Sequence, residues 1–133
     1  MMFGPGSASA IYLCTRAVDM RKSFDGLSGE VSQHMGRDPA SGDYFVFTNR
    51  QRDRLKILVF DRHGYWVLAK RLEQGRFNLS LSEEALRSGQ INLPREELMC
   101  IIEGIDLRSI RRHRRYVLPA KASAGEIKKN DVS

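Results

Sequence analysis

The residues of this chain whose type and spacing best suit ligand chemistry are arginines. Three of them alternate within one short stretch, at Arg50, Arg52 and Arg54. Further basic residues follow along the chain at Lys70, Arg71 and Arg76. A guanidinium group is planar and can hold two phosphate or carboxylate oxygens at once. The pattern therefore points to a surface that binds an anionic partner.

Charge around these residues is one-sided. Between positions 50 and 76 the chain has eight basic residues, namely Arg50, Arg52, Arg54, Lys56, Arg62, Lys70, Arg71 and Arg76. It has three acidic residues there, Asp53, Asp61 and Glu73, so the local net charge is +5. A second cluster comprises Arg108, Arg111, Arg112, Arg114 and Arg115, with no acidic residue between Leu107 and Gly125. We expect these two clusters to form a phosphate-binding surface.

The whole chain supports the same interpretation without proving it. Its 22 lysines and arginines against 16 acidic residues give a net charge of +6, which favours contact with polyanions such as nucleic acid. Two other interpretations stay open. The arginines could form a solvated face partly paired with Asp53, Asp61 and Glu73, or they could dock on an acidic partner protein.

Sequence motifs for catalysis are missing from the 133 residues. There is no Gly-rich phosphate loop, no nucleophile elbow and no zinc-protease motif. A metal-dependent nuclease would need carboxylates converging on one metal ion. The candidates Asp19, Asp25, Asp38, Asp43 and Asp61 each have a local explanation as a cap, turn or surface residue. We therefore expect no enzyme, no catalytic residue, no metal site and no cofactor.

The two cysteines, Cys14 and Cys100, lie in apolar contexts and are expected to be free thiols, as in a reducing cytoplasm. No apolar run is long enough to span a bilayer, so we expect a cytoplasmic protein that contacts no membrane and no small-molecule substrate.

The organisation we expect is a flexible leader at 1–9, a single domain at 10–118 and a disordered tail at 119–133.

Hydrophobic patterning predicts an α+β fold. Strands are expected at 11–15, 44–48, 54–60 and 65–72, with further possible strands at 77–81 and 90–93. The connections at 49–53 and 61–64 are short, so the three middle strands should form an antiparallel meander within a sheet of about four or five strands. Trp66 is expected in the core, with base stacking beside Tyr65 as the alternative.

Two helices should pack on this sheet. The first has Asp19 as its cap, apolar residues at Phe24, Leu27, Val31 and Met35, and Gly36 as its stop. The second starts at Pro94, ends near Gly104 and has an apolar stripe at Leu98, Ile101, Ile102 and Ile105, expected to face the core. Residues 82–89 are ambiguous, and a short helix capped by Ser82 is one interpretation.

Six ordered blocks of this sequence resemble one known family, the TnpB accessory proteins of insertion sequence 66 transposons. The blocks are Asp19–Leu27, Gly36–Gly42, Tyr44–Arg50, Asp53–Leu58, Gly64–Phe77 and Ile102–Asp106. They match DMRK…DGL, GRDP.SG, FVF.NR, DR.K.L, KRLE.GRF and LEGID in that order, and the resemblance covers roughly residues 10–118. Ile101 and Ile102 stand where the family usually has leucines. The larger RNA-guided nuclease also called TnpB is unrelated.

The resemblance implies a small companion of a transposase in a bacterial mobile element. The transposase would carry out strand transfer, and this chain would assist without catalysing. Our first hypothesis is that it binds transposon DNA, or DNA held by the transposase. The binding residues would be Arg50, Arg52, Arg54, Lys70, Arg71, Arg76 and the second cluster. The second is that it is a protein adaptor, docking on the transposase of the same element without contacting DNA.

Overall fold

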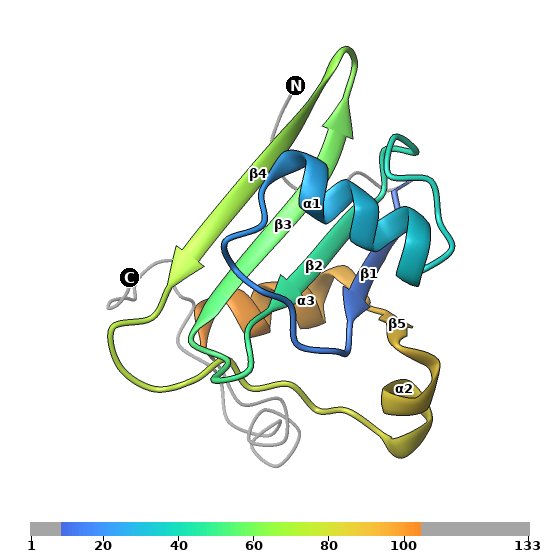
Figure 1. Cartoon of the computed structure of the whole chain (residues 1–133). Helices are drawn as coiled ribbons and strands as arrows, with labels where there is room; N and C mark the ends of the chain where they lie inside the picture. Colours follow the sequence, from blue (N-terminus) through green and yellow to red (C-terminus); the bar gives the residue numbers. More distant parts are fainter. Residues whose placement is uncertain (1–8, 105–133) are drawn as a thin grey trace.

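The computed structural model describes residues 9–104, which form one five-stranded sheet with helices on both faces (Figure 1). The strands are β1 (Ile11–Cys14), β2 (Tyr44–Thr48), β3 (Arg54–Asp61), β4 (Gly64–Arg71) and β5 (Gln90–Asn92). Their order across the sheet is β4-β3-β2-β1-β5. The predicted α+β class is confirmed, and so is the antiparallel meander of β2, β3 and β4.

The sheet is nevertheless mixed, because β1 runs parallel to β2 while the other neighbours are antiparallel. Parallel neighbours need a long crossover connection. Residues 15–43 provide it and include α1 (Phe24–Gly29) and the π-helical turn η1 (Glu30–His34). The remaining helices are α2 (Glu83–Ser88) and α3 (Arg95–Glu103).

The helices differ from prediction mainly at their ends. Helix α1 begins after Ser23, so Asp19 is not its cap; the Asp19 carboxylate instead accepts hydrogen bonds from Arg21. The helical segment does stop before Gly36, which adopts a left-handed φ of 65°. Pro94 precedes the first helical residue of α3 rather than being that residue. The short helix α2 is capped as proposed, with the Ser82 Oγ accepting from the Ala85 amide at 3.1 Å.

Apolar side chains form a separate core on each face of the sheet. On one face, Leu27 of α1, Val31 of η1 and Met35, which follows η1, pack against Phe45, Phe47 and Leu58. On the other, Leu98 and Ile101 of α3 pack with residues that include Leu13, Val46 and Ile57. The prediction that the α3 stripe faces the core is therefore confirmed for Leu98 and Ile101, while Ile105 lies outside the described residues. Strand β2 lies between the two cores, which explains why all five of its residues are buried.

Two predictions were wrong, the possible strand at 77–81 and the placement of Trp66 in the core. Residues 77–81 form no strand; Phe77 is buried in the α3-side core, and its amide donates to the Arg52 carbonyl at 2.7 Å. The prediction failed because an extended segment with alternating apolar and polar residues has the pattern of a strand even when no neighbouring strand pairs with it. Trp66 is not a core residue, because it lies on the edge strand β4 with 46% of its surface exposed.

Strands β3 and β4 form a long hairpin whose tip extends beyond the neighbouring strands (Figure 1). Its two-residue turn places Arg62 at a left-handed φ of 61°. No helix between residues 9 and 104 is long and apolar enough to cross a membrane.

Candidate nucleic-acid interface

Five of the six arginines of the first cluster gather at one end of the sheet, whereas Arg62 lies at the other end, in the turn of the β3–β4 hairpin. The turn after β2 presents Arg50 and Arg52, and β3 begins at Arg54, directly opposite Arg71 at the end of β4. The chain after β4 then runs back along this turn. The Leu72 amide donates to the Asp53 carbonyl at 2.8 Å, and the Phe77 amide donates to the Arg52 carbonyl. These two bonds hold the segment that contains Arg76 beside the turn.

Asn49 organises this turn. Its Oδ1 accepts hydrogen bonds from the amides of Asp53 at 3.0 Å and Arg54 at 3.1 Å. Its Nδ2 donates to the Asp53 carboxylate at 2.7 Å. The Asn49 side chain thus adds to the two backbone hydrogen bonds of the turn, from the Asn49 amide to the Arg54 carbonyl and from the Arg52 amide to the Asn49 carbonyl. The backbone between these bonds includes Arg52 at a left-handed φ of 59°.

The structure separates Lys70 from the arginines. Opposite residues of antiparallel strands point to the same face, so Arg54 and Arg71 share the α1 side of the sheet with Lys56. Lys70 points to the α3 side, where its Nζ donates to the Ile102 carbonyl at 2.7 Å. A cation at the C-terminus of a helix interacts favourably with the last carbonyls and the helix dipole. Lys70 therefore has a local structural role near α3.

Acidic residues neutralise little of this surface. The Asp53 carboxylate is held by Asn49, and Asp61 lies at the other end of the β3–β4 hairpin. Glu73 forms an exposed ion pair with Arg71 at 3.0 Å. Within residues 9–104, four arginines of the first cluster form no ion pair with an acidic residue. They are Arg50, Arg52, Arg54 and Arg76. Of the arginines at this end of the sheet, only Arg71 therefore has the acidic partner, within the described residues, that the interpretation as a solvated, partly paired face requires.

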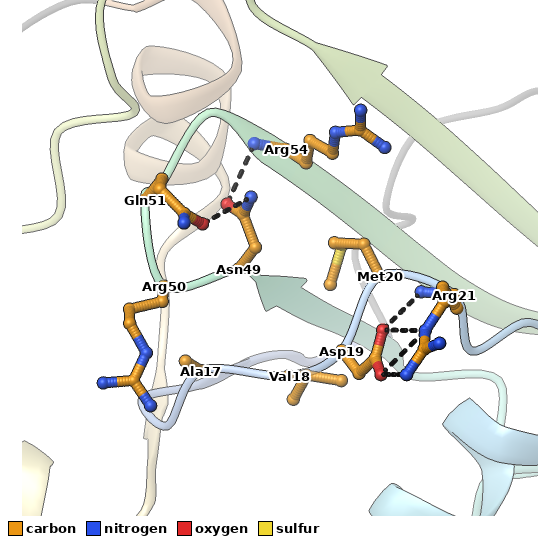
Figure 2. Close-up of a pocket in the computed structure, with 9 residues that line it drawn as sticks. All are labelled: Ala17, Val18, Asp19, Met20, Arg21, Asn49, Arg50, Gln51 and Arg54. Carbon is orange, nitrogen blue, oxygen red and sulfur yellow. Dashed lines mark hydrogen bonds and ion pairs between the residues drawn. The ribbon is translucent and has the colours of Figure 1, made fainter.

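A pocket of about 510 Å³ lies beside the turn (Figure 2). One wall is the turn itself, with Asn49, Arg50, Gln51 and Arg54, and the other is the segment Ala17–Arg21. The two walls are joined where the Val18 amide donates to the Thr48 carbonyl at 2.9 Å. Figure 2 shows the Met20 side chain between the two walls, with the guanidinium groups of Arg21, Arg50 and Arg54 at the margin.

The Ala17–Arg21 wall was not among the predicted site residues. Its signal in the sequence is weak, because it approaches the arginine turn through the parallel pairing of β1 and β2. Within it, the Arg21 guanidinium donates to both oxygens of Asp19, the shortest bond being 2.7 Å. These side-chain hydrogen bonds, with a further one from the Arg21 amide, lower the pKa of Asp19 to about 2. Arg21 is thus the one arginine of the pocket whose charge is already balanced.

The remaining predictions concern the cysteines, a metal site and the second arginine cluster. Burial raises the pKa values of both Cys14 and Cys100, and both thiols are free. Between residues 9 and 104, no three His, Cys, Asp or Glu side chains lie where they could hold a metal ion. The second arginine cluster, Arg108, Arg111, Arg112, Arg114 and Arg115, lies outside the described residues.

Comparison with known proteins places the chain in a family. A family model described as "IS66 Orf2 like protein" matches residues 9–112. The uncharacterized protein y4jC of Sinorhizobium fredii (strain NBRC 101917 / NGR234) is 31% identical over 111 residues, covering 84% of this chain and 92% of its own. The uncharacterized protein y4hO of the same strain is 31% identical over 107 residues, covering 80% and 90%. No solved structure matches significantly. The chain therefore belongs to the IS66 Orf2-like family, the TnpB accessory proteins of insertion sequence 66 elements, whose role is accessory to transposition.

Proposed function

We propose that this accessory protein binds the DNA of its own element through the arginine-rich end of the sheet. The observation that carries the proposal is the set of arginines at this end, Arg50, Arg52, Arg54 and Arg76, that have no acidic partner within the described residues. Unbalanced guanidinium groups on one open surface attract phosphates. Arg71, whose guanidinium pairs with the exposed Glu73, lies next to them.

In this proposal the protein does no chemistry on DNA. It acts in the cytoplasm beside the transposase of the same element, which carries out strand transfer. The basic surface holds the DNA backbone, and the second cluster, Arg108, Arg111, Arg112, Arg114 and Arg115, adds further phosphate contacts. Backbone contacts fix the position of a protein on DNA without reading its sequence.

Salt dependence of DNA binding tests the proposal. On duplex DNA, log K falls by about 0.9 per unit of log salt for each phosphate that the protein neutralises. Replacing Arg50 and Arg54 together with glutamine should lower this slope by roughly 1.8. The matched control is Arg87→Gln, on α2, whose guanidinium pairs with Glu83 at 3.8 Å. The assay is fluorescence anisotropy with duplexes containing the element ends.

The two variants and the wild-type protein give outcomes that distinguish DNA binding through these arginines from no DNA binding. An unchanged slope in Arg87→Gln and a reduced slope in the double variant support the proposal. No binding by the wild-type protein at about 50 mM salt, up to high micromolar concentration, would overturn it, because electrostatic contacts are strongest at low salt.

A second candidate function, a protein adaptor for the transposase, is favoured by the exposure of Trp66 on edge strand β4. Tryptophans at interfaces often dominate binding energy. The apolar stripe of α3 does not support this function, because Leu98 and Ile101 are each 1% exposed. Co-purification of the two proteins after nuclease treatment, lost in Trp66→Ala, would support the adaptor. Failure to co-purify at any salt concentration would exclude it.

A further inference from the structure

The pocket beside the arginine turn continues into a second depression. The first, of about 510 Å³, and the second, of about 290 Å³, are both lined by Met20 and Arg54. The second extends along the α1 side of the β3–β4 hairpin, past Lys56 to Arg71. The two depressions adjoin at Met20 and Arg54. We call them together the Met20 groove, whose lining includes Arg50, Arg54 and Arg71.

An apolar centre distinguishes the Met20 groove from a plain basic surface. Met20 is half-buried and Val18 is buried, and both line the groove between its charged margins. Phosphate binding needs no apolar surface, since phosphates stay hydrated and charged. The flat faces of bases do, and a thioether is polarizable and packs well against aromatic rings. The exposed Gln51 also lines the groove and offers a side-chain amide that can bond to a base edge.

The Arg54–Arg71 pair adds a second observation. The two residues are directly opposite each other on adjacent strands and on the same face. Like charges placed this way are destabilising. The carboxylate of Glu73 pairs with Arg71 only, and because this pair is exposed it offsets just part of the repulsion. An anion bound between the two guanidinium groups would remove the repulsion. The groove thus combines an apolar surface at Met20 with a place for a phosphate at Arg54 and Arg71.

A blunt duplex cannot use both features. Its bases are stacked inside the helix, so it presents phosphates to a concave, nucleotide-sized site but no base face. An unpaired strand can place a base on an apolar surface while its backbone follows a basic groove. We infer that the Met20 groove binds unpaired DNA, with a base against Met20 and backbone phosphates at Arg50, Arg54 and Arg71. This inference rests on the proposed DNA binding and specifies which form of DNA is preferred.

Three DNA probes test the inference by anisotropy: a blunt duplex, the same duplex with a single-stranded overhang, and a single strand. The full-length protein should bind the overhang probe at least about fivefold more tightly than the blunt duplex, the lower end of what one stacked base contributes. Met20→Ala should remove this preference. The matched control is Met99→Ala, an exposed methionine on α3, which should keep the preference.

Equal affinity of the wild-type protein for blunt and overhang probes would overturn the inference and leave the proposed function standing. No binding to any probe at about 50 mM salt would overturn both. A folded Met20→Ala protein that kept the preference would also overturn the inference.

Because Met20 packs partly against the α1-side core, the variant could lose its fold, so a second measurement uses the wild-type protein. A 4-thiothymidine in the overhang is cross-linked by light, and the peptide is identified by mass spectrometry. Cross-links within 17–21, 49–56 or 69–71, the segments that line the groove, support the inference, and cross-links confined to other segments overturn it.

Discussion

Asn49 is the residue on which the arginine turn depends, and Asn49→Ala is the sharpest single test of the structure. The substitution removes two hydrogen bonds to the amides of Asp53 and Arg54, one to the Asp53 carboxylate and a longer one, of 3.4 Å, to the Gln51 Oε1. Its own backbone bond to the Arg54 carbonyl remains. A neutral hydrogen bond contributes about 1 kcal/mol, and one to a charged group about 1.5–3 kcal/mol.

The turn is partly exposed, so water replaces part of each lost bond. We therefore expect Asn49→Ala to lower the free energy of unfolding by about 2 kcal/mol, which is less than the sum of these values. For a domain of this size, that corresponds to a fall in Tm of roughly 8 °C. The measurement is urea unfolding followed by circular dichroism, with a thermal scan alongside.

The control is Asn78→Ala, because Asn78 is exposed and no hydrogen bond of its side chain is found in the described part of the chain. It should change stability by less than about 0.5 kcal/mol. If Asn49→Ala lowered the free energy of unfolding by less than about 0.5 kcal/mol, Asn49 would not be the organiser of the turn. The turn should also lose order, so the salt slope of DNA binding should fall although Arg50, Arg52 and Arg54 are all still present.

Three further predictions follow from other features. Arg62→Gly should leave stability unchanged or raise it by up to about 1 kcal/mol in urea unfolding, because glycine adopts a φ of 61° without steric cost and arginine does not. Phe77→Ala should lower the free energy of unfolding by about 3–5 kcal/mol, because the ring is 1% exposed in the α3-side core although it belongs to no strand. In an NMR titration, the Asp19 carboxyl should show a pKa of about 2, and Arg21→Ala should return it toward its ordinary value of 3.8. Since folding lowers this pKa, the contribution of the pair is present above about pH 4 and is lost as the pH falls toward 2.

Each of these has a clear contrary result. A clear loss of stability in Arg62→Gly would mean that the arginine side chain supports the hairpin. A cost below about 1 kcal/mol for Phe77→Ala would mean that the ring is not a core anchor. An Asp19 pKa that stayed the same in Arg21→Ala would show that the guanidinium is not its cause.

Much of the fold followed from local patterns in the sequence. Short connections at 49–53 and 61–64 dictated the meander of β2, β3 and β4, because closely spaced strands pair as hairpins. The spacing of Leu98 and Ile101 marked the buried side of α3, and Ser82 marked the start of α2. Six ordered sequence blocks also pointed to the family, which the match over residues 9–112 confirms.

Sequence reasoning was less successful where distant segments meet. Strand patterning could not show that β4 is an edge strand, so Trp66 was assigned to the core. It could not show that residues 77–81 lack a strand partner. Nor could a count of charges show that Asn49, rather than an arginine, holds the Asp53 carboxylate.

The sequence by itself determined that this protein has a basic, arginine-rich turn between two strands, because residue types and turn spacing are local properties. The tertiary structure alone decided what surrounds that turn. Parallel pairing of β1 with β2 brings Met20 beside Arg54, and the order of the sheet turns Lys70 toward α3 and Arg71 toward α1. These placements depend on which strands pair and which helix covers which face, and long-range packing sets both.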